Sequence, residues 1–183
     1  FDIDTLDHPD FPSSGFSVSA EAFQIANLNT QFGIEGDTYT RYHAQGRFAF
    51  GSERWGGVAN LEGGQSDDPG VVLQSLFFLG GFRNLSAYSE RGLPNNEYWL
   101  ASVETYRRLT SSDAVGALPI YVGALVEYSE FTFDLSQGNI YSQDVASITG
   151  YGAINTLIGP AYLGVSFGDR GNKAIFLYIG RNF

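Results

Sequence analysis

The chain has 183 residues, enough for one domain, and 43% of them are hydrophobic and 15% aromatic, yet its mean hydropathy is only −0.10. It has no run of about 18 consecutive apolar residues, which excludes a transmembrane helix. The net charge of −10 argues against a nucleic-acid partner, because binding nucleic acid needs a basic surface.

An acidic segment opens the chain, with Asp2, Asp4, Asp7 and Asp10 ahead of the first predicted strand. Carboxylates can bind calcium, but these four do not have the spacing of a calcium-binding loop, and a turn rich in Asp is favoured. The two histidines are too few and too far apart for a His-based site. We therefore expect neither a metal nor a cofactor.

Segments in which apolar and polar residues alternate recur along the chain, as is typical of β-strands with two different faces. The clearest covers residues 39–51, where Phe48 and Phe50 share one face and Arg41 and Arg47 the other. About eight strands are predicted, over residues 16–28, 39–51, 55–66, 99–109, 120–134, 145–158, 161–168 and 174–183.

The apolar face of these strands has two possible environments. A soluble sandwich would bury it against a second sheet, whereas a membrane barrel points it at lipid and the charged face at the lumen. We predict an all-β, antiparallel transmembrane β-barrel. Its expected lipid-facing residues are Phe48, Phe50, Ala101, Val103, Val122, Val126, Leu163, Val165, Leu177 and Ile179. Its expected inward-facing residues are Arg41, Arg47, Glu62, Glu104, Arg108 and Glu127.

One connection is far longer than usual and covers about residues 67–96. It includes an apolar run from Leu76 to Leu79, so it should fold back onto the protein, with its LGGFRNLSAY segment in the barrel lumen. Glu127 lies in mid-strand on the inward face, where a buried carboxylate needs a partner. We expect it to pair with Arg83 or Arg91; the alternative is a solvated carboxylate in a wet lumen.

Motifs of catalysis are absent from the sequence. No GxSxG nucleophile motif occurs, and the most similar string, GFSVS from Gly15, lacks the second Gly and lies in a predicted strand. No phosphate-binding loop is present. We therefore expect no catalytic residue and no enzymatic activity in this chain.

The last predicted strand, AIFLYIGRNF, has Ile175, Leu177 and Ile179 in alternation and ends on Phe183. This pattern resembles the C-terminal insertion signal of outer-membrane barrels. Gly159-Pro160 and the IGRNF ending are similar to the last strands of the BamA/TamA/FhaC outer-membrane superfamily, and the opening DIDTLDHPDFPSSG resembles an earlier strand start in that family. The resemblance implies a bacterial outer-membrane location, with lipid and the barrel assembly machinery as partners.

Within this superfamily, LGGFRNLSAY followed by Gly92-Leu93-Pro94 resembles the patatin-like phospholipase branch, the PlpD type of type Vd secretion. There, a lipase and a small periplasmic domain precede the barrel. The resemblance implies that residues 1–183 are one surface-antigen-type barrel domain from a longer protein, related to half of a sixteen-stranded barrel. It also implies that the loop residues Arg83, Leu85, Ser86 and Tyr88 contact Glu127.

Three functions remain open at this stage. The first is the anchoring or translocating barrel of a patatin-like phospholipase-type protein. The second is a barrel that assembles or exports other proteins, although its family motif V-R-G-[FY] is replaced here by Leu85-Ser86-Ala87-Tyr88, without the Arg. The third is a soluble all-β binding domain. If the chain is a barrel, its eight strands either close alone or are completed by missing strands or a second copy.

Overall fold

A computed structural model of the chain describes residues 1–26, 38–52, 54–67, 75–110, 118–135, 139–156 and 159–180. Within these ranges the fold is all-β, and no helix is long and apolar enough to cross a membrane. The antiparallel main sheet contains β1 (Asp2–Asp4), β2 (Gly15–Ala26), β3 (Thr38–Gly51), β4 (Trp55–Ser66), β7 (Glu97–Arg108), β8 (Ile120–Leu135), β9 (Asn139–Thr156), β10 (Gly159–Gly168) and β11 (Lys173–Ile179), in that order. A separate pair is formed by β5 (Phe77–Leu79) and β6 (Leu93–Asn95).

The predicted all-β antiparallel fold is confirmed, and the eight predicted strands correspond to the eight long strands of the main sheet. Some bounds differ. β9 begins at Asn139, six residues before the predicted start, because β8 and β9 stay paired as far as Leu135 and Asn139. Backbone pairing does not need an apolar side chain, so it continues past the alternating pattern. The short strand β1, which pairs with the start of β2, was not predicted.

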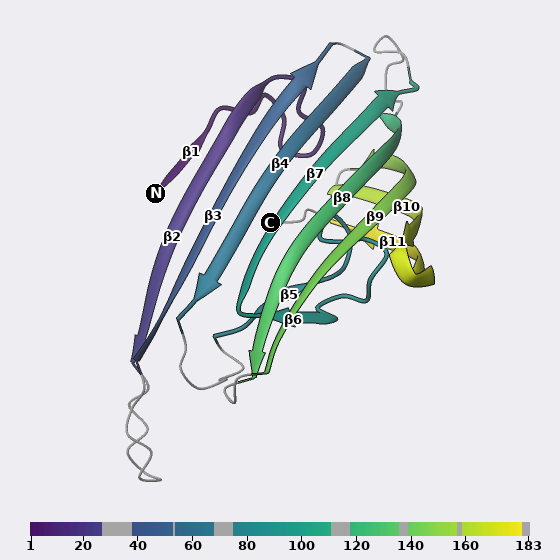
Figure 1. Cartoon of the computed structure of the whole chain (residues 1–183). Coiled ribbons are helices and arrows are strands. Elements are labelled where there is room, and N and C mark those ends of the chain that lie inside the picture. Colours follow the sequence, from purple (N-terminus) through teal and green to yellow (C-terminus); the bar gives the residue numbers. More distant parts are fainter. Residues whose placement is uncertain are drawn as a thin grey trace.

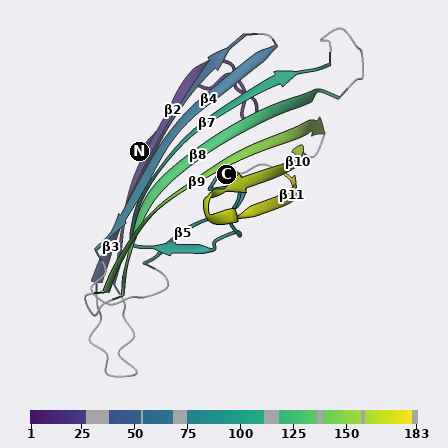
Figure 2. The same ribbon diagram turned by 45° about the vertical axis from the view of Figure 1, so that its right-hand side comes forward.

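The sheet is open rather than closed into a barrel, with β1 and β11 as its edges among the described strands (Figure 1). It is strongly curved. Figure 2 shows β10 and β11 curling toward the side on which β5 lies, so that side is the concave one. Every long strand pairs with its neighbour in the sequence, except that the connection containing β5 and β6 lies between β4 and β7.

The two faces of the sheet have the compositions predicted from the alternation. The convex side, called here the apolar face, exposes large apolar side chains from all eight long strands. They include Phe16, Val18, Tyr42, Phe48, Phe50, Leu61, Trp99, Val103, Val122, Val126, Ile148, Leu163, Val165, Ile175, Leu177 and Ile179. The expected lipid-facing residues all lie on this face, although Ala101 is only half-exposed. The structure thus confirms the shared face and leaves lipid contact as a prediction.

The concave side, called here the polar face, has the six residues expected to point inward. Glu104 and Glu127 are buried, and the other four are half-buried. Two segments cover this face: the turn of residues 5–14 between β1 and β2, and residues 75–96, called here the docked loop. Together they pack in two apolar clusters, and Phe82 of the docked loop contacts the same cluster as the turn. Phe11 packs in one cluster with Tyr106 and Tyr162, and Leu85 packs in the other.

Candidate functional site

The docked loop is shaped by unusual backbone conformations. Gly80 and Gly81 have φ of 112° and 106°, and Arg83 and Leu85 have φ of 63° and 69°. Positive φ is uncommon for residues other than glycine and persists only where surrounding contacts enforce it. Internal hydrogen bonds tighten the segment: the Gly80 amide donates to the Asn84 carbonyl at 2.7 Å, and the Gly81 amide to the Tyr88 carbonyl at 3.2 Å.

Glu127 holds the tip of this loop on β8. Its side chain is fully buried, and its two carboxylate oxygens accept the backbone amides of Leu85 and Ser86, each at 2.8 Å. The Ser147 hydroxyl on β9 donates to the same carboxylate. Consecutive backbone N–H groups make a natural anion-binding concavity, and hydrogen bonds to a charged acceptor are about twice as strong as neutral ones. The Glu127 carboxylate therefore holds the loop by binding the loop's backbone amides.

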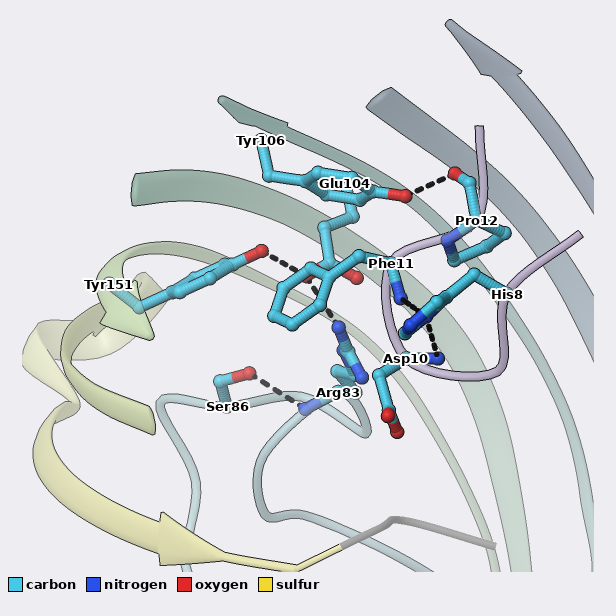
Figure 3. A network of polar contacts seen from close by, with 9 residues as sticks. All are labelled: His8, Asp10, Phe11, Pro12, Arg83, Ser86, Glu104, Tyr106 and Tyr151. Atoms are coloured by element: carbon cyan, nitrogen blue, oxygen red, sulfur yellow. Dashed lines mark hydrogen bonds and ion pairs between the residues drawn. The ribbon is translucent and has the colours of Figure 1, made fainter. Parts of the chain in front are cut away.

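Arg83 does not pair with Glu127, which corrects the prediction. Its guanidinium donates to Glu104 on β7 at 2.8 Å, and the Tyr151 hydroxyl on β9 donates to the same Glu104 oxygen (Figure 3). The physical reason is that the loop amides and Ser147 already occupy the Glu127 carboxylate. Glu104 is one strand away on the same face and remains available to the Arg83 side chain.

Aromatic rings surround the Arg83–Glu104 pair. The guanidinium lies 5.2 Å from the Phe82 ring centroid and 5.1 Å from that of Tyr162. Tyr151 lies flat over Gly123, where an added Cβ would come within 2.3 Å of the ring, so the glycine makes room for Tyr151 to reach Glu104. The other candidate cation, Arg91, is exposed and lies over the Phe78 ring, 4.7 Å from its centroid.

The loop is also attached to the last hairpin. The Tyr88 hydroxyl donates to Asp169, in the turn Asp169–Gly171 between β10 and β11. The five residues predicted to form the loop contact thus lie in one region of the polar face, four on the loop and Glu127 beneath them. The additional partners Glu104, Tyr151 and Ser147 were not predicted as loop contacts, although the alternation placed Glu104 on the inward face.

The turn of residues 5–14 is the second segment that covers the polar face. Its packing there was not predicted from the sequence. Phe11 stacks on Tyr121 at 3.9 Å between ring centroids, and the Tyr106 hydroxyl donates to the Pro12 carbonyl (Figure 3). His8 caps this turn, because its Nδ1 accepts the amides of Asp10 and Phe11 at 3.1 and 3.0 Å. One aromatic residue in a turn gives no sequence signal that it will insert into a core.

In the acidic segment at the start of the chain, Asp7 stabilises a turn, which is the alternative that the sequence favoured over a calcium-binding loop. Asp7 accepts the Ser13 amide and hydroxyl at 2.8 and 2.7 Å and the Ser14 amide at 3.1 Å. The Ser13 hydroxyl, helped by these amides, lowers the pKa of Asp7 to about 2. In the described part of the chain, no group of three or more acidic or histidine side chains is arranged to hold a metal ion.

The residues of the predicted C-terminal signal are partly described. Ile175, Leu177 and Ile179 alternate on the exposed side of β11, with 83%, 70% and 59% of their surfaces exposed. Phe183 lies outside the described residues. A comparison of the sequence with known protein families finds no match, and a comparison with curated proteins finds none either.

Proposed function

We propose that this chain is the membrane-embedded β-barrel part of a bacterial outer-membrane protein, and that it anchors or translocates a patatin-like phospholipase-type partner domain. The observation that carries this proposal is the distribution of residues between the two faces. The apolar face extends without a break over all eight long strands, whereas carboxylates and tyrosines are buried on the opposite, concave face. A water-soluble domain has the reverse arrangement.

The extent of the apolar face supports a lipid environment. Soluble monomers rarely expose contiguous apolar patches beyond about 300–600 Å². On β8 the apolar stretch of this face extends from Ile120 to Tyr128, and the next outward residue is the exposed Glu130. Nine residues match the length of a tilted membrane-spanning strand, about 9–11 residues. On the neighbouring β9, Asp144 likewise precedes the apolar stretch.

The open edges require that the barrel be completed. An unpaired backbone group costs several kcal/mol in hydrocarbon. If the chain spans a bilayer, β11 and the part of β2 that β1 does not cover therefore need partners. Either further strands of a longer protein or a second copy of this chain supplies them. Light scattering of the purified chain in detergent distinguishes the two, because closure by a second copy gives the mass of a dimer.

The finer part of the proposal, a patatin-like phospholipase parent, rests on the resemblance in LGGFRNLSAY and Gly92-Leu93-Pro94. The docked loop supports it only indirectly, since the amides of Leu85 and Ser86 bind Glu127 without the arginine of the assembly factors. Reading the gene upstream of Phe1 tests it. A GxSxG motif followed by an Asp-Gly pair supports a lipase, and another upstream domain overturns this part alone.

The membrane part of the proposal is tested by refolding. The chain is diluted from urea into phospholipid vesicles, into detergent and into plain buffer, and its β-structure is followed by circular dichroism. We expect folding with vesicles, flotation with them and retention through an alkaline wash, with aggregation in plain buffer. A monodisperse folded monomer in plain buffer that does not float would establish a soluble domain instead.

A further inference from the structure

An open groove of about 880 Å³ crosses the apolar face from β2 to β8. Its walls are two rows of outward side chains, joined across the strands by the register of the sheet. The first row continues past the groove onto β9 and contains Ala20, Ala44, Gly63, Trp99, Glu130 and Asp144. The second row contains Ala22, Tyr42, Gln65, Glu97 and Thr132. The residues between the two rows point their side chains to the polar face. Between the rows, the floor of the groove is therefore formed by backbone, and the groove lies on the apolar face.

The first row leaves open space over β2, β3 and β4, because its residues on these strands are small. Ala20, Ala44 and Gly63 have almost no side chain, whereas Tyr42 and Trp99 are large and exposed. The volume lies within the range of ligand pockets, about 300–1,000 Å³. Its length over four strand spacings is about 19 Å. A long, narrow and mainly apolar channel of this kind fits an alkyl chain.

The two ends of the groove differ in character. At the β7–β8 end, Glu97 and Glu130 are exposed, and Asp144 on β9 is the partner of Glu130 across the sheet. At the β2 end the same row reaches Ala20, in the middle of an apolar stretch. Strands of membrane barrels tilt by about 35–45°, so a row perpendicular to the strands changes depth. The groove therefore descends from the charged boundary into the apolar band.

These carboxylates lack cationic partners among the described residues. The ion pairs found there are His43 with Glu21 and Arg83 with Glu104, both on the polar face. Within the described part of the chain, the Glu130 side chain accepts one side-chain hydrogen bond, from the Trp99 indole N–H at 3.3 Å. Like charges directly opposite in a sheet are destabilising, as Glu130 and Asp144 are here. A cation placed beside them would relieve that repulsion.

We propose that this groove binds a phospholipid with an amine headgroup, its alkyl chain over Ala20, Ala44 and Gly63 and its ammonium beside Glu97 and Glu130. The inference rests on the proposed membrane location. An ammonium complements the negative charge at the boundary, and the chain fills the apolar channel that side chains leave open. A lipid with an anionic headgroup is repelled from the same end.

The two tryptophans of the chain make the test specific, because both lie on the apolar face but only Trp99 lines the groove. Trp55 lies elsewhere, beneath Arg107. The variants Trp55→Phe and Trp99→Phe each leave one reporter. Each is refolded into vesicles of mixed phosphatidylethanolamine and phosphatidylglycerol in which either lipid has brominated chains, and tryptophan quenching is measured.

We expect brominated phosphatidylethanolamine to quench Trp99 about two- to fivefold more than brominated phosphatidylglycerol, the scale of an exposed ion pair. Trp55 should show no preference. In the Trp55→Phe background, Glu97→Gln with Glu130→Gln should remove the preference through charge. Ala44→Leu should reduce quenching of Trp99 by filling the groove while the carboxylates remain.

Equal quenching of Trp99 by the two lipids would overturn the proposal, as would a preference that survives the double Gln variant. A preference for phosphatidylglycerol that requires Mg²⁺ would also overturn it and indicate an anionic lipid bridged by a cation. If neither tryptophan is quenched by either lipid, the proposed membrane function fails, and the groove proposal fails with it.

Discussion

Glu127→Gln is the most informative single change, because it keeps the size of the buried side chain and removes only the charge and one acceptor. In the native loop, the Leu85 and Ser86 amides each have their own carboxylate oxygen at 2.8 Å. A glutamine offers one oxygen, so one buried amide faces an NH₂ group instead. Leaving a buried donor unsatisfied costs about 1–3 kcal/mol. At about 1.4 kcal/mol per factor of ten, this cost makes the released loop about 5 to 140 times more populated.

Trypsin cleavage after Arg83 measures this release, because Arg83 is held against Glu104 in the docked loop. When the loop recloses faster than trypsin cuts, the cleavage rate follows the open population. We expect cleavage of the Glu127→Gln variant in detergent to be at least about fivefold faster, with the sheet still folded by circular dichroism. Glu130→Gln, on the opposite face of the same strand, is the matched control and should not change the rate. Equal rates in all three proteins would refute the role of Glu127.

Three further changes test other parts of the structure. Val103→Arg, in the middle of the apolar face, should lower the unfolding free energy in vesicles by about 2–4 kcal/mol. The control Gln65→Arg, at a strand end, should lower it by only about 0–1 kcal/mol. If Val103→Arg leaves the unfolding free energy unchanged, this face does not meet lipid. Arg83→Met should lower the free energy of unfolding by about 3–5 kcal/mol, because it leaves the Glu104 carboxylate buried without its cation. Adding Glu104→Gln should recover most of this loss, as measured by chemical unfolding. No recovery would contradict the ion pair. The pKa of Asp7 is lowered to about 2 in the folded chain. The stabilisation of the turn by its carboxylate is therefore complete above about pH 4 and is lost as the pH falls through about 2. Asp7→Asn should remove that pH dependence from hydrogen exchange of the two amides that Asp7 binds. An unchanged exchange profile would exclude this role.

Much of the fold could be predicted because side chains of a strand alternate between two faces, so one register assigns every residue of the strand. For this reason the sequence alone assigns Val103 and Glu104 to the correct faces of the sheet. The strand ends were less predictable. Residues 139–144, NIYSQD, do not alternate, because two apolar residues are followed by three polar ones, and only the pairing with β8 shows that they belong to β9.

The candidate site could be predicted only in outline. A long apolar loop and an inward carboxylate indicated that the loop docks near Glu127. The choice of partner for Arg83 was not predictable, because Glu104 is the cross-strand neighbour of Leu125, two residues from Glu127, and both carboxylates face the same side. What decides between them is that the loop backbone occupies Glu127. Every residue except proline has a backbone donor, so the sequence does not indicate which of them will bind a carboxylate.

The central claim is that the apolar face meets lipid, and cysteine labelling in vesicles tests it most directly. The chain has no native cysteine, so each introduced thiol is a unique reporter. The neighbours Ser102 and Val103 on β7, and Ile148 and Thr149 on β9, point to opposite faces. A thiol reagent confined to the bilayer should label Val103→Cys and Ile148→Cys rapidly, and Ser102→Cys and Thr149→Cys far more slowly. If Val103→Cys and Ile148→Cys resist this reagent but react with a charged, water-soluble one, the apolar face meets water and the claim is wrong.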